Sequence, residues 1–144
     1  MKPWPKCGWK KMMNADAVMD TSAIAALAFL EPGADVVRER LRRDRCVMHA
    51  VNLSEACFTL PRKRPDRFDF RSARAWLDSI GIFPMYGFDE SWLAAVSSIR
   101  LSARALNFGD GVAVALASAL GVPLVTAEKA FAGAEGFARV ELIR

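Results

Sequence analysis

Short apolar runs alternate along the chain with longer stretches in which apolar residues recur every three or four positions. The short runs lack the strict alternation of a strand with one solvated face, and they predict buried strands at residues 17–19, 46–48, 82–86, 124–126 and 138–143. The stretches between them predict helices at residues 21–30, 34–43, 52–60, 70–80, 89–105 and 109–120. Residues 61–69 are polar and include two prolines, so we expect a connection there.

This order of elements predicts an α/β fold with a three-layer α/β/α arrangement, in which helices cover both faces of a central, mainly parallel sheet. A chain of 144 residues suits one domain. Hydrophobic residues make up 53% and charged residues 25% of the chain, which is typical of a packed globular protein and excludes a disordered or collagen-like one. Ligands of such sheets bind beyond the carboxyl ends of the strands, so we expect the functional residues there.

No segment predicts a membrane span or an export signal. The longest nearly apolar stretch, residues 23–30, is much shorter than the roughly 20 residues that cross a bilayer, and the N-terminus lacks the apolar block of a secretory signal. The three cysteines form no CxxC pair and are odd in number, so neither a disulfide framework nor a zinc site is predicted. We therefore expect a soluble cytoplasmic protein.

The basic character of the chain comes from its first residues. Four lysines stand within residues 1–14 without an acid, and they equal the formal net charge of +4. This segment also has two prolines, two tryptophans and no periodicity. We interpret residues 1–14 as a basic extension that is disordered, contacts nucleic acid, or lies upstream of a true start at Met12 or Met13, and residues 15–144 as the folded domain.

Four acidic residues fall where strand ends and helix starts are expected to meet. Asp20 ends the first strand, Glu55 lies in the helix after the second, Asp110 opens the helix before the fourth, and Glu128 follows the fourth. The first three have no adjacent Lys or Arg in the sequence, and a buried carboxylate is costly without a partner. Converging carboxylates suit Mg²⁺ or Mn²⁺ and do not suit zinc, and such an ion promotes reactions at phosphodiesters.

Each of these acids also has an ordinary structural explanation. Asp20 could cap the helix that follows it, and Asp110 could stabilise the start of its own helix, where the helix dipole favours a carboxylate by about 0.3–1 kcal/mol. Glu55 points away from the apolar face of its helix and could be a solvated surface residue, and Glu128 could simply be exposed. Their recurrence at equivalent places favours a common site.

Three blocks of the sequence resemble the PIN-domain family, in particular toxins of the VapC type. The blocks are MDTSAIAALAFLEPGAD at residues 19–35, AVNLSEACFTL at residues 50–60 and LNFGDGVAVALASALGVPLVTAEKAF at residues 106–131. The resemblance runs from Val18 to the C-terminus and is weakest between Pro61 and Ser102. The family usually has Asp where this chain has Glu128, which is one methylene longer and bears on whether a second ion binds.

The resemblance implies a metal-dependent endoribonuclease, the toxin of a type II toxin–antitoxin module, which inhibits translation and is silenced by a cognate antitoxin. Members of the family commonly form homodimers. Carried over by position, the acidic quartet consists of Asp20, Glu55, Asp110 and Glu128. Asp20 and Asp110 would be the principal ligands of Mg²⁺ or Mn²⁺. Ser22 and Thr126 would be hydroxyl neighbours that orient carboxylates or water.

Two basic segments are candidates for RNA contact, because phosphate neutralisation supplies most non-specific affinity. Residues 38–45 hold five arginines against two acids, and residues 62–74 hold six basic residues against two, with Phe68 and Phe70 between them. The second segment offers both charge and stacking surface. Its candidate RNA-binding residues are Arg62, Lys63, Arg64 and Arg67. Either segment could instead be a solvated helix face, and an antitoxin's acidic segment could use the second.

Two other classes of protein stay open. A PIN-like module that has lost catalysis would act only as a binding partner, an alternative that Glu128 keeps. A phosphoacceptor receiver domain also uses a strand-end aspartate, a threonine and a lysine, as at Thr126 and Lys129. That class, however, needs adjacent acids at the first strand and an aspartate at the end of the third, which this chain lacks. His49, the single histidine, and Cys57 are expected to be packing residues.

Overall fold

A computed structural model describes residues 14–144, so the predictions for residues 1–13 lie outside the described part of the chain. The strands are β1 (Ala17–Met19), β2 (Cys46–His49), β3 (Ile82–Met85), β4 (Leu124–Thr126) and β5 (Val140–Leu142). The helices are α2 (Thr21–Ala28), α3 (Ala34–Arg43), α4 (Ala50–Lys63), α5 (Phe70–Ser79), α6 (Glu90–Ser102), α7 (Phe108–Leu120) and the 3₁₀ helix η1 (Lys129–Ala134). None of these described helices is long and apolar enough to cross a membrane.

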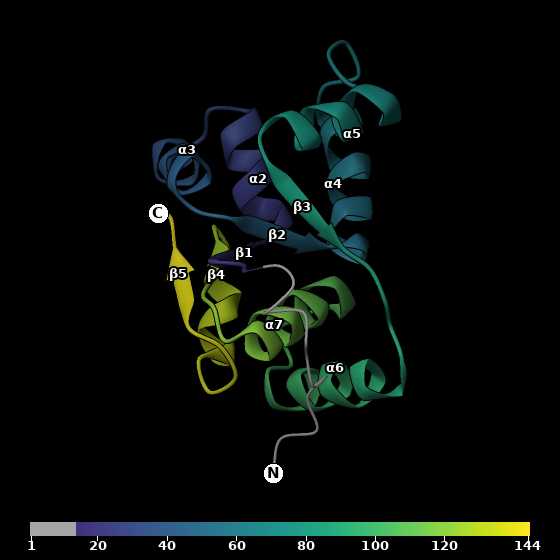
Figure 1. Ribbon diagram of the computed structural model, residues 1–144, viewed down its shortest axis with the longest axis vertical. Coiled ribbons are helices and arrows are strands. Elements are labelled where there is room, and N and C mark those ends of the chain that lie inside the picture. Colours follow the sequence, from purple (N-terminus) through teal and green to yellow (C-terminus); the bar gives the residue numbers. More distant parts are fainter. Residues whose placement is uncertain (1–13) are drawn as a thin grey trace.

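The strands form one sheet in the order β3-β2-β1-β4-β5, and each neighbouring pair is parallel. In Figure 1 the sheet runs through the middle of the molecule, with α2, α3, α4 and α5 on one side and α6 and α7 on the other. The predicted three-layer α/β/α fold is confirmed. The chain proceeds from β1 to β2 and β3 on one side and returns to β4 and β5 on the other, so β1 lies at the switch point of the topology.

The central strands are buried on both faces, which explains their unbroken apolar runs. Val18 packs into the core shared with α6 and α7, whereas the next residue, Met19, packs into the core shared with α2, α4 and α5. Helix α7 is buried along most of its length. It begins after an Asn107 cap and ends at Gly121, whose φ of 68° is readily adopted by glycine.

Helix α4 begins earlier and ends later than the predicted residues 52–60. The Nδ1 atom of His49 accepts a hydrogen bond from the backbone N–H of Val51 at 3.1 Å, so a histidine cap starts the helix before the predicted boundary. Pro61 lies inside the last turn and lacks a backbone N–H. Because the neighbouring Leu60 is 1% exposed, its burial in the core holds this turn in the helical conformation.

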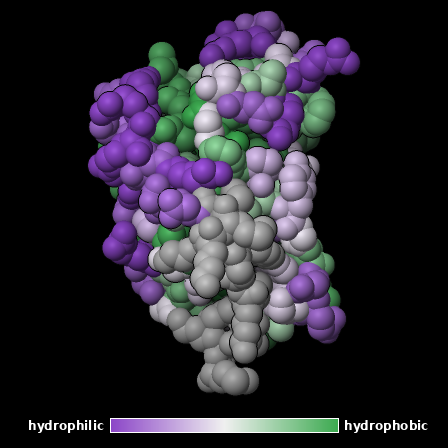
Figure 2. Space-filling model, viewed as in Figure 1, coloured by the Kyte–Doolittle hydropathy of each residue, from purple (hydrophilic) through white to green (hydrophobic). Residues whose placement is uncertain are grey.

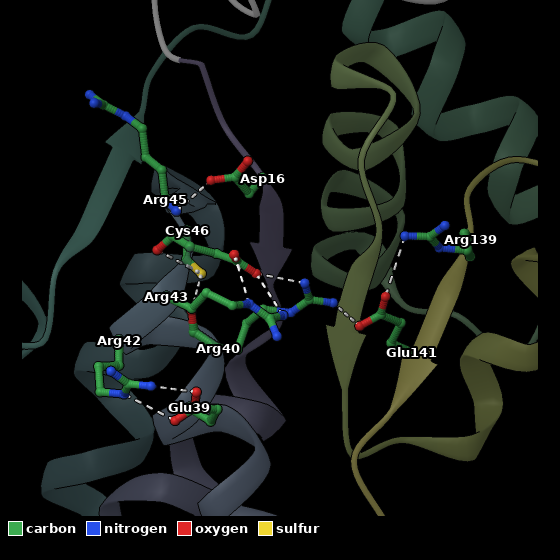
Figure 3. Close-up of polar contacts among 10 residues, drawn as sticks. Asp16, Glu39, Arg40, Arg42, Arg43, Arg45, Cys46, Arg139 and Glu141 are labelled. Atoms are coloured by element: carbon green, nitrogen blue, oxygen red, sulfur yellow. Dashed lines mark hydrogen bonds and ion pairs between the residues drawn. The ribbon is translucent and has the colours of Figure 1, made fainter.

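An ion-pair network joins α3 to the edge strand β5 (Figure 3). Arg40 contacts Asp44 at 2.6 Å and also pairs with Glu141 on β5. The other arginines of α3 pair with nearby acids: Arg38 with Asp35, Arg42 with Glu39, and Arg43 with Asp44. These pairs support the interpretation of residues 38–45 as a solvated helix face.

An exposed apolar groove lies between α2, α3 and α5. Its volume is about 420 Å³, and its apolar lining consists of Leu27, Ala28, Leu30, Leu41, Trp76 and Ile80. Figure 2 shows a hydrophobic strip between the hydrophilic side chains over α3 and those at the top of the molecule. Arg67 lies at the rim of this groove, so this member of the second basic segment faces away from the acidic quartet.

Candidate active site

The acidic quartet lines one cleft at the carboxyl edge of the sheet. The cleft has a volume of about 400 Å³. Asp20 directly follows β1, Glu55 lies in the first half of α4, Asp110 lies in the first turn of α7, and Glu128 follows β4. Because β1 and β4 are neighbours in the sheet, the segments that follow them meet at this edge. Four separate elements therefore each contribute one carboxylate.

Asp20 is held by hydrogen bonds that reach only one of its oxygens. Its Oδ2 accepts from the hydroxyl of Ser22 at 2.6 Å, from the hydroxyl of Thr126 at 2.9 Å and from the backbone N–H of Ser22 at 3.3 Å. The residue is 4% exposed and also caps α2. Asp20 can therefore cap α2 and still present an oxygen to the cleft, since Oδ1 takes part in none of these three bonds.

Ser22 and Thr126 also fix the backbone that carries Glu128. The hydroxyl oxygen of Ser22 accepts from the N–H of Ala127 at 2.9 Å, and that of Thr126 accepts from the N–H of Glu128 at 3.0 Å. Each hydroxyl has a single proton, which it donates to Asp20, and its lone pairs remain free to accept. The side chain of Glu128 itself is exposed.

Glu55 lies against the start of α7, where Asn52 holds it. The Asn52 Nδ2 group donates to Glu55 Oε1 at 3.0 Å and to the carbonyl of Gly109 at 2.9 Å, and Asn52 is fully buried. A Cβ atom at Gly109 would overlap the Glu55 carboxylate. Burial and the charge of Asp20 raise the pKa of Glu55, although the bond from Asn52 opposes this shift. Sequence reasoning gave Asn52 no role; the available signal was its place one helical turn before Glu55.

Asp110 forms a reciprocal cap with Asn107. The N–H of Asp110 donates to Asn107 Oδ1 at 2.8 Å, and the N–H of Asn107 donates to Asp110 Oδ2 at 3.1 Å. Burial, together with the charges of Asp20, Glu55 and Glu128, raises the pKa of Asp110 to about 6 against the lowering effect of the Asn107 bond. The neighbouring carboxylates therefore act on Asp110 electrostatically, in addition to its role at the helix start.

The quartet is not neutralised by a cation of the described chain. None of the ion pairs within residues 14–144 includes a member of the quartet. Nor do three acidic, histidine or cysteine side chains of that range already stand at the spacing of a closed metal-ligand cluster. The donors are nevertheless hard carboxylate oxygens that face one cleft and repel one another, a set that fits a divalent cation such as Mg²⁺ or Mn²⁺.

Two of the four predicted RNA-binding residues line this cleft. Arg62 and Lys63, at the end of α4, are part of its wall. Arg64 and Arg67 instead bind an acid and a backbone carbonyl elsewhere on the protein. The cleft also includes Arg144, which sequence reasoning missed because nothing near it in the chain marks it as a site residue.

A match to a family model identifies the chain. The model of the PIN domain matches residues 17–136, a range that contains the whole acidic quartet. The chain belongs to the PIN-domain family. PIN domains are generally nucleases that use divalent metal ions, and this membership excludes the receiver-domain alternative.

Solved structures share the PIN fold of this chain. PAE2754 from Pyrobaculum aerophilum superimposes with a TM-score of 0.65 at 19% identity, covering 94% of this chain and 92% of that one. VapBC2 from Rickettsia felis, bound to a DNA fragment from its promoter, gives a TM-score of 0.61 at 13% identity, covering 87% of this chain and 96% of that one. FitAcB from Neisseria gonorrhoeae gives 0.56 at 19% identity, with coverages of 88% and 97%. These likenesses concern the fold, and no curated protein matches the chain by sequence.

Proposed function

We propose that this PIN domain is a metal-dependent endoribonuclease, the toxin of a type II toxin–antitoxin module, which cleaves RNA and thereby inhibits translation. The observation that carries the proposal is the convergence of the acidic quartet on one cleft whose wall also includes Arg62 and Lys63. The sequence blocks that resemble VapC-type toxins support the toxin assignment, as does the fold shared with VapBC2 and FitAcB.

The quartet would hold the metal ion. Its principal ligands would be Asp20 and Asp110, with Glu55 and Glu128 completing the pocket. A divalent ion, when bound there, supplies polarisation of a phosphoryl oxygen and a lowered pKa of bound water. The chain itself orients three of the carboxylates, because hydroxyl donors reach Asp20, an amide donor reaches Glu55 and the backbone N–H of Asn107 reaches Asp110.

The same resemblance leads us to propose two protein partners, a cognate antitoxin that silences the enzyme and a second copy of the chain in a homodimer. Copurification with the product of an adjacent small gene tests the first. Sedimentation of the purified chain alone tests the second, and a monomer at all concentrations would contradict it.

Cleavage of a mixed pool of cellular RNA by the purified protein tests the nuclease function. We expect discrete products with Mg²⁺ or Mn²⁺, none with EDTA, and none with Asp110→Asn, since Asn can still accept the bond from Asn107 but lacks the charge that a metal ion requires. Glu135→Gln removes one acid at an exposed position outside the cleft and is the matched control. RNA cleavage by Asp110→Asn at the wild-type rate would refute the assignment of Asp110 to the active site. No cutting with either metal, in protein free of antitoxin, would favour a binding module.

A further inference from the structure

Three basic side chains line the cleft in addition to the acidic quartet. Arg62 and Lys63 come from the last turn of α4, and Arg144 follows β5. Glu55 and Lys63 are both on α4, and at 1.5 Å per residue they are separated by about 12 Å along the helix axis. The cleft therefore has an acidic end, formed by the quartet, and a basic end, formed by these three residues.

Glu31 holds two of the three cations at the basic end. Lys63 Nζ lies 3.9 Å from Glu31 Oε2, and Arg144 Nη1 lies 3.3 Å from Glu31 Oε1. The side chains of Glu31, Lys63 and Arg144 are 32–43% exposed, and ion pairs with this much exposure are weak. An ammonium group has three donors and a guanidinium group five, so both cations keep donors for a second anion.

The backbone before Arg144 brings this residue to the cleft. The N–H of Ile143 donates to the carbonyl of Thr126 at 3.0 Å and so ties this segment to the end of β4. The side chain of Ile143 packs so closely on Gly33 that a Cβ there would lie 2.7 Å from it. Arg144 Nη1 also donates to the carbonyl of Pro32 at 3.4 Å. The position of Arg144 is thus set by contacts with β4 and with the loop after α2.

Other arginines of the second basic segment are engaged away from the cleft. Arg64 pairs with Asp66 at 2.6 Å, and Arg67 donates to a backbone carbonyl of α2 at 2.9 Å. Arg62, in contrast, belongs to no ion pair within residues 14–144, and its guanidinium lies 5.6 Å from the ring centre of Phe58. Of the four candidate RNA-binding residues, Arg62 and Lys63 therefore bring their charge to the cleft, whereas Arg64 and Arg67 do not.

We propose that the basic end binds a backbone phosphate of the RNA strand whose cleaved phosphodiester lies at the acidic end. This inference rests on the proposed nuclease function. Lys63 and Arg144 supply the direct donors and Arg62 supplies further charge, so the strand is oriented along the cleft by phosphate contacts rather than by its bases. Without a metal ion the quartet repels any anion, so charge alone does not separate a phosphodiester from an acidic peptide. A phosphodiester suits the cleft better because the divalent ion that the quartet fits acts on phosphodiesters.

Binding of a short, fluorescently labelled single-stranded RNA, measured by anisotropy in EDTA, tests the proposal without cleavage. We expect Lys63→Gln and Arg144→Gln each to weaken binding about fivefold at low salt. Each variant is also expected to reduce the slope of log K against log[salt] by about 0.7, the value for one lost phosphate contact on a single strand. Arg139→Gln removes the same charge from an exposed, ion-paired position outside the cleft and outside both basic segments, and is the matched control, with less than a twofold effect expected.

Effects of Lys63→Gln and Arg144→Gln no larger than that of Arg139→Gln would overturn the phosphate site, whether or not the protein cuts RNA. Equal competition by polyglutamate of matched charge would also overturn it, by showing that the basic end takes carboxylates as readily as phosphates. If the variants weaken RNA binding as expected but the wild-type protein cuts no RNA with Mg²⁺ or Mn²⁺, the phosphate site stands and the proposed nuclease function fails.

Discussion

The carboxylate of Asp110 is stabilised by its own helix and destabilised by its neighbours. Its Oδ2 accepts the N–H of Asn107 at 3.1 Å, and the start of a helix favours a negative charge. Burial and the charges of the other three members of the quartet oppose ionisation and prevail, because the pKa of Asp110 is raised to about 6. The metal-free protein therefore keeps this charged site at a cost to its stability.

Replacing Asp110 with Asn should stabilise the metal-free protein. Between about pH 4 and pH 6 the folded protein holds a proton that the unfolded chain has lost, so this group lowers the free energy of unfolding as the pH rises through that window. In EDTA at pH 7.5 we expect Asp110→Asn to raise the free energy of unfolding by about 1–2 kcal/mol, allowing for solvent screening. Urea unfolding of both proteins measures the difference, and a less stable variant at pH 7.5 would contradict the interpretation.

Gly109 is the residue at which a single added methyl group should harm the site most. A Cβ there would overlap the Glu55 carboxylate, so Gly109→Ala must displace Glu55 from Asn52 and from α7. We expect a loss of stability of about 1–3 kcal/mol and at least a tenfold loss of RNA cleavage. Gly136→Ala is the control, because nothing lies within 4 Å of the new Cβ, and it should change neither the stability nor the rate of RNA cleavage. Wild-type cleavage by Gly109→Ala would show that the position of Glu55 does not matter.

At the scale of the element, His49 connects the start of α4 to the loop before α6. Its Nδ1 accepts the N–H of Val51, so the proton of the neutral ring is on Nε2, which donates to the carbonyl of Gly87 at 2.7 Å. The ring is 2% exposed and packs 4.9 Å from the ring of Trp92. Protonation of Nδ1 would remove the cap of α4, because the imidazolium cannot accept a hydrogen bond.

Acid should therefore weaken the protein through His49. Burial lowers the pKa of His49, although the Gly87 bond opposes the shift. The unfolded chain then binds a proton before the folded protein does, so the stability contributed by the neutral ring is present above about pH 6.5 and is lost as the pH falls toward the lower folded value. His49→Asn keeps a capping acceptor and cannot titrate.

The difference between His49→Asn and wild type isolates this effect from the opposite one at Asp110. We expect the variant to be less stable than the wild type at pH 7.5, because it loses the bond to Gly87. This difference in stability should narrow as the pH falls to 5. Thermal unfolding across this range provides the measurement. A difference that stays constant with pH would mean that the pKa of His49 is the same in the folded protein and in the unfolded chain, and would contradict the interpretation.

Most element boundaries could be predicted because local sequence determines them. Asp69 and Ser72 form a capping box at the predicted start of α5, and Gly121 ends α7 where its position predicted. The bounds of α4 could not be predicted, because its histidine cap and its proline-containing last turn depend on contacts with distant segments. The 3₁₀ helix η1 has no helical periodicity in sequence and was not predicted; burial of Phe131 anchors it.

At the scale of the whole molecule, a metal ion should bind only the folded protein, since the quartet comes from four elements. Mg²⁺ or Mn²⁺ is then expected to raise the Tm, with about 2.7 kcal/mol of stabilisation at a metal concentration one hundred times Kd. Asp110→Asn should lose most of this shift, whereas Glu135→Gln should keep it. Scanning calorimetry with and without metal gives the values, and an equal shift in all three proteins would point to a different ion site.

The convergence of the acidic quartet on one cleft could be predicted from the sequence because parallel strands bring their carboxyl ends to one edge. Asn52 and Gly109 were not identified as site residues, because their contact appears only when α4 packs on α7. The pairing of Glu31 with Arg144 joins residues from opposite ends of the described chain, and nothing local marks either one. Contacts of this range follow from the complete packing of the fold.

The order of strands in the sheet has a consequence for the newly made chain on the ribosome. Strand β1 pairs on one side with β2, which follows soon after it in the chain. On the other side it pairs with β4, which leaves the ribosome only after α7. Until then Asp20 lacks the hydroxyl of Thr126, and the segment that carries Glu128 has not been made. A nuclease assembled in this order would remain harmless to its own messenger RNA until most of the chain has been translated.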